Sequence, residues 1–296
     1  MTYSGRPAKH IQRRMVVEAL RRLDAIISLK KYRYVGFGGL EFLDFDLVHR
    51  TLGISQMTSI EHDSAKAKRF GFNRPFRGIR LLMGKASEFL PSVDWRGPRI
   101  VWLDYEVMLT GEVLRDAETV ARVLRPGSVL IVTINAAAPI HERLKTLEAN
   151  VGKERVPDGT KEDGLEGWSL ARTQRVILAE AVQGVVDARA DDVALEQIFN
   201  FHYRDGARMQ TIGWLLSSKA LEASVKEKCK FHELDYVRTG AQAMDLVLPD
   251  LTEREIAYLN RLLPVSSGGQ LKELWLPQSE QDQYASIYRW YPGEAS

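Results

Sequence analysis

The chain has 296 residues, 45% of them hydrophobic and 27% charged, enough for one large α/β domain or for one domain with a smaller appendage. Its 41 basic and 39 acidic residues leave a net charge of +2, so the overall charge does not indicate a nucleic-acid partner, although a local patch could provide one. The single cysteine, Cys229, excludes an intramolecular disulfide and a cysteine zinc site and fits a reducing cytoplasm. The basic N-terminal stretch lacks an apolar signal core, and no window approaches about 18 uncharged apolar residues. We therefore predict a cytoplasmic protein without a membrane span.

Residues 1–31 are predicted to form an N-terminal helical segment. Residues 1–10 are polar and are expected to be loose. From Ile11 to Lys30, apolar residues recur at helical spacing with arginines between them. These arginines are expected to form a solvated face or, alternatively, a surface that contacts phosphate.

The stretch from Tyr32 to Asp63 predicts a strand, a glycine-rich turn, a helix from about Glu41 to Leu52, and a second strand from Met57 to Ile60. Glycine allows positive φ and close approach of a ligand, and the helix N-terminus favours a carboxylate or phosphate. Glu61 follows the turn by about 20 residues, where a Rossmann-type unit places an acceptor for ribose hydroxyls. The residues expected to bind a ligand here are Gly36, Phe37, Gly38, Gly39, Asp44, Glu61 and His62.

Three further apolar runs and a hairpin complete the predicted sheet. The runs cover Ile79–Met83, Arg99–Leu103 and Ser128–Ile134, and the last is apolar enough to be buried on both faces. Asp-Gly at 205–206 joins two β-prone runs, 195–204 and 207–217, which predicts an antiparallel hairpin. Residues 151–168 are rich in glycine and charge and are expected to form a mobile loop, a candidate lid. Helices are expected over Ser64–Phe72, Thr110–Leu124, Pro139–Ala149 and Ser169–Ala188.

Asp104, Tyr105 and Glu106 follow the fourth strand, at the sheet edge that faces the ligand crevice in open parallel sheets. Either acid could take a proton from a hydroxyl, and Tyr105 could position that hydroxyl. The same residues could instead form a capped loop, or the two acids could hold a divalent cation. No third acidic partner is evident at a matching strand end, so we predict no metal site.

Residues 219–296 read as an α+β appendage. Strands are expected over 231–237 and 241–248, and Thr252 is expected to cap a helix to Leu262 with Glu255 three residues after the cap. The aromatic residues of the tail are expected to pack on their own domain or, alternatively, to cover a substrate or form a homodimer interface. They are Trp275, Tyr284, Tyr288, Trp290 and Tyr291.

Residues 32–218 resemble class I S-adenosylmethionine (SAM) methyltransferases, whose sheet ends with a seventh strand inserted antiparallel. The motifs that carry the resemblance are VGFGG, Glu61, GKAS after the third strand, LDYE after the fourth, RPGS before the fifth, and the final hairpin. The pattern G-x-G-x-x-x-F-x-D-F, of prokaryotic O-methyltransferase-like proteins, is met by Gly36, Gly38, Phe42, Asp44 and Phe45.

The resemblance implies a Rossmann-like, mostly parallel seven-stranded sheet, SAM as cofactor, and methyl transfer to an oxygen or nitrogen of an unidentified acceptor. Ala86 and Ser87 would read the adenine, and Asp104 would also contact the cofactor. Acids at the start of the first long helix of the unit, Asp44 among them, would balance the charge of SAM or simply favour the helix dipole.

Tyr34 and Lys85 occupy positions where these enzymes usually carry acids, which keeps a non-catalytic nucleotide sensor or partner-binding module as the alternative. A nicotinamide oxidoreductase is a third reading, which the hairpin disfavours.

Overall fold

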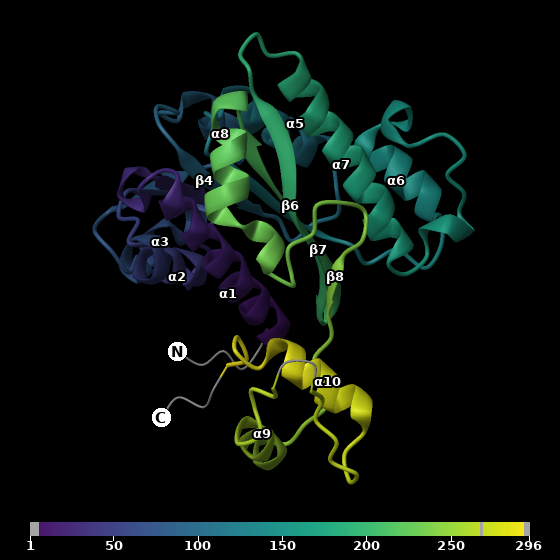
Figure 1. The fold of residues 1–296 in the computed structure, drawn as a ribbon. Helices are drawn as coiled ribbons and strands as arrows, with labels where there is room; N and C mark the ends of the chain where they lie inside the picture. The colour runs from purple at the N-terminus through teal and green to yellow at the C-terminus, as the bar shows by residue number, and fades with distance from the viewer. Residues whose placement is uncertain (1–5, 267–268, 293–296) are drawn as a thin grey trace.

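An eight-stranded sheet forms the centre of the structure, a computed structural model that describes residues 6–266 and 269–292 (Figure 1). The strands are β1 (Arg33–Gly36), β2 (Met57–Glu61), β3 (Ile79–Met83), β4 (Arg99–Asp104), β5 (Val129–Asn135), β6 (Ala194–Asp205), β7 (Ala207–Ser217) and β8 (Met244–Leu246). They lie in the order β3-β2-β1-β4-β5-β7-β6-β8. Strands β1 to β5 are parallel, and β7 is inserted antiparallel between β5 and β6. The predicted Rossmann-like fold with a terminal hairpin is confirmed, with β8 added parallel to β6.

Helices cover both faces of this sheet and bury two separate apolar cores. The helices are α1 (Pro7–Arg21), α2 (Leu43–Leu52), α3 (Ala67–Asn73), α4 (Ala86–Phe89), α5 (Gly111–Val123), α6 (Arg143–Val151), α7 (Ser169–Asp187), α8 (Lys219–Ser224), α9 (Glu253–Asn260) and α10 (Gln278–Ile287). Because successive strand side chains alternate between faces, Ile100 and Trp102 of β4 point into the core shared with α1 and α2. Val101 and Leu103 point into the core shared with α5 and α7. This double burial explains the uninterrupted apolar strands of the sequence.

The N-terminal helix differs from its prediction at both ends. The expectation for residues 1–5 lies outside the described residues, but residues 6–10 are not loose, because α1 begins at Pro7 and buries Lys9 and His10. Proline suits the first helical position, and the carboxylate of Asp205 accepts hydrogen bonds from the backbone N–H groups of Ala8 and Lys9, at 3.1 and 2.7 Å. The helix ends at Arg21, and two short 3₁₀ turns follow, so the α-helix does not continue to Lys30.

Two predictions for residues 219–248 are also corrected. Residues 231–237 form no strand: a 3₁₀ turn covers Phe231–Glu233, and the rings of Phe231 and Tyr236 are buried in the core beneath α1. Of residues 241–248, only those of β8 form a strand, which pairs with β6. The sequence of residues 231–237 resembles that of a strand because its aromatic residues are buried one by one in the core.

The appendage has a small core of its own, and in Figure 1 its helices α9 and α10 lie below the sheet. Thr252 caps α9 in a capping box with Glu255, as predicted. The tail packs on its own chain: the Tyr284 hydroxyl donates to Asn260 at 2.7 Å, and Trp290 packs edge-on against Tyr236. The indole N–H of Trp290 also donates to Glu18 of α1.

The stretch 151–168 contains two 3₁₀ turns, Lys153–Arg155 and Asp163–Leu165. Leu165 is fully buried, and Glu162 accepts hydrogen bonds from the first backbone N–H groups of α6. These contacts fasten the stretch to the domain. Across residues 6–266 and 269–292, the structure has no helix of the length and apolar character needed to span a membrane.

Candidate active site

The glycine turn lies between β1 and α2, as predicted, and two of its residues require glycine for different reasons. Gly39 has a φ of +59°, which is a left-handed conformation. Gly38 is needed for space, since a Cβ atom there would stand 2.4 Å from the ring of Phe42 and 2.9 Å from the hydroxyl of Ser59. Because Phe42 is fully buried, its ring cannot move away, and the conformation of the turn is fixed.

Glu61, at the end of β2, reaches back to this turn. Its Oε1 accepts hydrogen bonds from the backbone N–H of Gly38 at 2.7 Å, from that of Gly39 at 3.2 Å, and from the Ser59 hydroxyl at 2.5 Å. Burial raises the pKa of Glu61, and these three hydrogen bonds oppose that shift. The turn and the acid predicted to share one ligand therefore meet in the folded chain.

The other predicted cofactor residues lie around this pair at different depths. His62 and Ser87 are exposed, whereas Ala86 is buried at the start of α4. Asp44 is buried rather than placed on the outer side of α2. Its Oδ2 accepts a hydrogen bond from the Tyr34 hydroxyl at 2.6 Å, and its Oδ1 is buried with no hydrogen-bond partner among the described residues. Burial raises the pKa of Asp44, although the nearby Arg13 opposes the shift.

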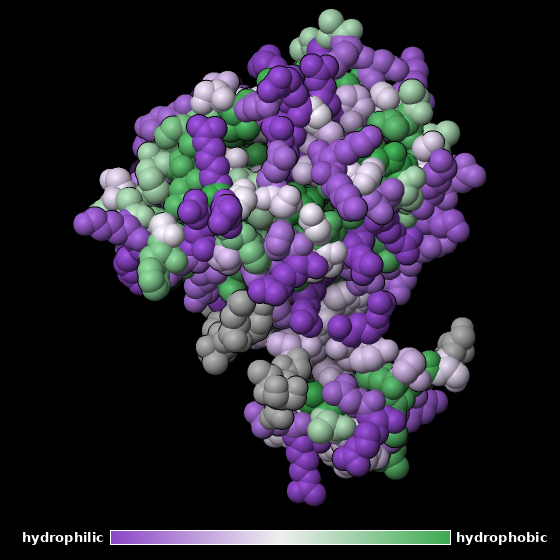
Figure 2. Space-filling view, turned by 90° about the vertical axis from the view of Figure 1, so that its left-hand side faces the viewer, coloured by the Kyte–Doolittle hydropathy of each residue, from purple (hydrophilic) through white to green (hydrophobic). Residues whose placement is uncertain are grey.

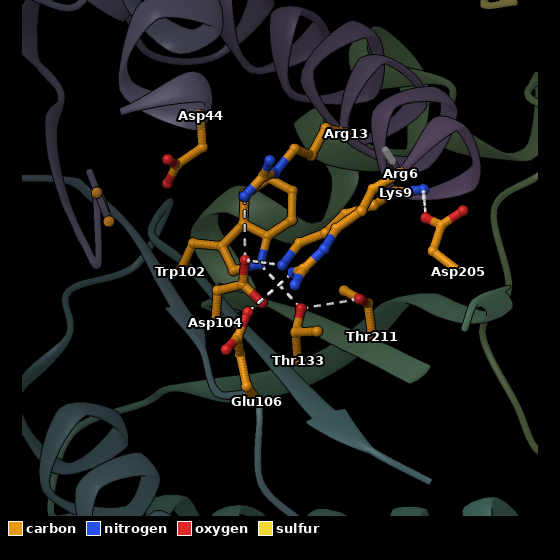
Figure 3. Close-up of polar contacts among 12 residues, drawn as sticks. Arg6, Lys9, Arg13, Asp44, Trp102, Asp104, Glu106, Thr133, Asp205 and Thr211 are labelled. Atoms are coloured by element: carbon orange, nitrogen blue, oxygen red, sulfur yellow. Dashed lines mark hydrogen bonds and ion pairs between the residues drawn. The ribbon is translucent and has the colours of Figure 1, made fainter. Parts of the chain in front are cut away.

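Two cations of α1 meet the carboxylate of Asp104 at the end of β4 (Figure 3). Oδ2 of Asp104 lies 2.8 Å from Nζ of Lys9 and 3.1 Å from Nη2 of Arg13. The three side chains are only 8%, 9% and 13% exposed for Asp104, Lys9 and Arg13. Oδ1 of Asp104 is buried and, among the described residues, unpartnered. The site thus holds a buried ion cluster with one carboxylate oxygen left over.

Arg13 joins this cluster to the glycine-turn side, because it points between Asp104 and Asp44 in Figure 3. Burial alone would lower the pKa of Arg13, but Asp44 and Asp104 raise it above its ordinary value. The prediction of a solvated arginine face on this helix is wrong for Arg13, since the helix lies across the strand ends and buries that face.

The three residues predicted as a catalytic group point in different directions. Asp104 shares the α1 side of the sheet with Trp102, and Glu106 forms an exposed ion pair with Arg6 at 2.8 Å. Tyr105 faces the other way: its hydroxyl donates to Asp116 of α5 at 2.6 Å, and its ring packs edge-on against Phe37 of the glycine turn. Burial, with Asp116 beside it, raises the pKa of Tyr105. Tyr105 thereby supports the turn, and its hydroxyl is already engaged.

Below the ion cluster, a buried line of hydrogen bonds fixes the strand ends. The indole N–H of Trp102 donates to the hydroxyl of Thr133 at 3.0 Å, and Thr133 bonds to Thr211 at 2.8 Å (Figure 3). β4, β5 and β7 are therefore cross-linked directly beneath Asp104. Within the described ranges, no group of three or more His, Cys, Asp or Glu side chains is arranged to hold a metal ion.

Solved structures that resemble the chain include several methyltransferases. An O-methyltransferase of tomaymycin synthesis from Streptomyces achromogenes, solved with SAM, is 14% identical over 69% of this chain and 80% of its own, with a TM-score of 0.41. An O-methyltransferase from Bacillus cereus, solved with SAH, is 16% identical over 68% and 80%, with a TM-score of 0.38. An N-methyltransferase from Bradyrhizobium japonicum is 11% identical over 69% and 96%, with a TM-score of 0.39. At such low identities and TM-scores these likenesses assign no activity.

A family model matches nearly the whole chain. No curated protein matches this sequence. The model of the family described as "Putative O-methyltransferase" matches residues 1–293, so it spans α1, the sheet and the appendage alike. The resemblance inferred from the glycine turn, Glu61 and the hairpin is confirmed by this match. The chain belongs to this O-methyltransferase family.

Proposed function

We propose that the protein is a SAM-dependent O-methyltransferase that binds its donor at the glycine turn and Glu61 and its acceptor beside Asp104. The observation that carries the proposal is the set of hydrogen bonds between Glu61 and the N–H groups of Gly38 and Gly39. These N–H groups hold the Glu61 carboxylate at the turn, where the ribose hydroxyls of SAM would donate to it. The acceptor and a cytoplasmic location remain predictions.

The residues present fit the charges of the donor. SAM carries an ammonium group and a sulfonium, and the site offers the buried Oδ1 of Asp44, which bonds to no residue that the structure describes. A buried carboxylate oxygen without a partner is costly, so a cationic ligand group there would relieve the cost. When bound, SAM supplies an electrophilic methyl group to a nucleophilic oxygen.

Asp104 is assigned to the acceptor. Its Oδ2 is engaged by Lys9 and Arg13, which leaves Oδ1 to accept a hydrogen bond from an incoming hydroxyl. Asp104 would take the proton of the acceptor hydroxyl as the oxygen receives the methyl group, while the bond between that methyl group and the sulfur of SAM breaks and S-adenosylhomocysteine leaves. The cover of α1 keeps bulk water from the reacting oxygen.

Calorimetry with SAM tests the donor half of the proposal. We expect binding to the wild-type protein, and at least about tenfold weaker binding to Glu61→Gln, because hydrogen bonds to a charged group contribute roughly 1.5–3 kcal/mol. Glu253→Gln, on the exposed side of α9, serves as the matched control and should bind like the wild type. Absence of heat with folded wild-type protein would reject the proposal.

Transfer of isotope-labelled methyl groups from SAM to a cell extract tests the acceptor half. Asp104→Asn should reduce transfer by about 10²-fold or more, the range for loss of general base catalysis, while SAM binding persists. If SAM binds and the wild type labels nothing, the second candidate function holds, a non-catalytic SAM sensor. One observation favours that candidate: α1 covers Asp104, and its Lys9 and Arg13 form ion pairs with the carboxylate that would otherwise act as the base.

A further inference from the structure

A strongly basic surface follows directly after the donor site in the sequence. Residues 64–87 contain seven basic side chains and no acidic one, although the whole chain has a net charge of only +2. The rest of the chain is therefore net acidic, and the basic residues of this stretch lie on α3, on the edge strand β3 and in the turns beside them. The basic residues are Lys66, Lys68, Arg69, Arg74, Arg77, Arg80 and Lys85.

An aromatic ring stands in the middle of these cations. Phe72 of α3 is 89% exposed, whereas Phe70 of the same helix is buried in the core. Lys68 and Arg69 precede Phe72 by four and three residues, which places them on the same side of the helix as the ring. We name the exposed residues Lys68, Arg69, Phe72 and Arg77 the α3 patch. Arg80 is not part of it, because Ile79 and Leu81 of β3 point into the core that α3 covers and Arg80 therefore points to the opposite face of the sheet. Figure 2 faces the side of the molecule on which α2 and α3 lie, and hydrophilic and hydrophobic side chains are interleaved there.

The cations of the α3 patch are available to a partner. Lys66 pairs with Asp63 at 2.6 Å, and Arg74 donates to the carbonyl of Ile79 at 2.9 Å. The three cations of the patch, by contrast, form no ion pair with any residue that the structure describes. A charged edge strand protects a sheet from pairing with other chains, which accounts for Arg80 of β3. It does not account for the cations and the exposed ring of α3, because α3 is not an edge strand.

The chemistry of the patch fits phosphates and bases together. Single-stranded nucleic acids are bound by grooves or faces in which cations follow the backbone and aromatic rings stack on bases. Membrane binding would need a longer helix with a broad apolar face, and α3 has seven residues and one exposed ring. We propose that the α3 patch binds single-stranded nucleic acid, with Phe72 stacked on a base and its three cations on phosphates.

The position of the patch connects it to the donor site. The side-chain amide of Asn73, at the end of α3, donates to the carbonyl of Leu40 in the glycine turn at 3.0 Å. A strand bound along α3 would therefore lie beside the turn proposed to hold the donor.

Fluorescence anisotropy with labelled single-stranded RNA and DNA of about 12 nucleotides tests this proposal. We expect dissociation constants of about 1–100 μM for the wild type at physiological salt. The affinity should fall as the salt concentration rises. Lys68→Glu with Arg69→Glu should weaken binding at least tenfold and reduce the salt dependence, because two phosphate contacts are lost. Phe72→Ala should weaken binding about tenfold and leave the salt dependence unchanged, because stacking carries no charge.

A matched control separates the patch from net charge. Arg254→Glu with Lys272→Glu makes the same charge change on exposed residues of the appendage and should leave the affinity within twofold of wild type. Equal weakening by both pairs of substitutions, or no binding by wild type at low salt, would overturn the proposal. So would tighter binding to phosphatidylserine vesicles than to RNA or DNA, if Phe72→Ala abolishes the vesicle binding.

Discussion

The two halves of the candidate site are held together over very different lengths of chain. In the donor half, Glu61 bonds to Gly38 only 23 residues away, and both belong to one strand–turn–helix–strand unit. In the acceptor half, Arg13 reaches Asp104 across 91 residues, and Asp205 caps α1 across 196 residues. The donor half is therefore built by local geometry, and the acceptor half exists only when α1 is docked.

The two halves also differ in the groups that surround their buried carboxylates. Glu61 is buried among neutral hydrogen-bond donors, which leaves its pKa raised by burial. Asp104 is buried against two full cations from another element. A change at Asp104 should thus disturb stability strongly, and a change at Glu61 should mainly disturb ligand binding.

Asp104→Asn should have the largest effect on stability. It leaves Lys9 and Arg13 buried without their shared partner, and breaking a buried ion pair from one side costs about 3–5 kcal/mol. Urea unfolding of the ligand-free protein would measure this loss in the free energy of unfolding.

Glu106→Gln is the matched control for this substitution. It breaks an ion pair made by the same N-terminal segment, but Arg6 and Glu106 are 58% and 69% exposed. Exposed pairs contribute below about 1 kcal/mol. If the two variants lost the same free energy of unfolding, burial of the Asp104 ion pairs would add nothing to the stability of the protein.

The same contrast explains what the sequence could predict. The turn, Glu61 and the strands of the sheet follow from short-range patterns, and all were placed close to their observed positions. Lys9 and Arg13 were missed, because a polar stretch reads as solvated until a distant acid is known to face it. Only Pro7, a frequent first helical residue, could have moved the helix start to its observed place.

One available signal was overlooked at the fourth strand. We predicted that Asp104 and Tyr105 act on one hydroxyl together, but successive residues of a strand point to opposite faces, and continuing the strand pattern would have separated them. The structure follows that alternation, with Asp104 toward α1 and Tyr105 toward Asp116. The partner of each still required the packing of helices, which no local pattern contains.

Gly38→Ala should have the second largest effect, and it acts on the donor half. The added methyl group would meet the buried ring of Phe42, and overpacking of this kind costs about 1–3 kcal/mol. Displacement of the turn should also weaken SAM binding by tenfold or more in calorimetry. Gly184→Ala in α7, where a Cβ atom meets open space, should instead stabilise the protein by about 0.5–1 kcal/mol. A neutral Gly38→Ala would show that the turn is not sterically fixed.

Asp205→Ala should have an intermediate effect that shows the long-range origin of the acceptor half. Loss of an N-cap costs about 0.5–2 kcal/mol, and here the cap comes from the β-hairpin. Hydrogen exchange should rise at the backbone N–H groups of residues 8–13. Thr252→Ala removes the local cap of α9 at a similar cost and should leave exchange in α1 unchanged. Unchanged exchange in α1 after Asp205→Ala would show that the ion cluster alone holds the helix.

Glu61→Gln should have the smallest effect on stability, and its sign depends on pH. Because burial raises the pKa of Glu61 in the folded state, its folded form is favoured while the carboxyl is protonated. That contribution is complete below the ordinary pKa of 4.5 and is lost as the pH rises through the folded value. Glutamine stays neutral, so the variant should match the wild type at pH 4 and exceed it at pH 8 by about 1 kcal/mol or less. Asp116 titrates in both proteins and cancels from the difference, whereas the substitution also removes the repulsion between Glu61 and Asp44, which favours the variant at high pH. A difference that is constant with pH, or that favours the wild type at high pH, would mean that the glycine-turn N–H groups stabilise the Glu61 carboxylate more than burial penalises it.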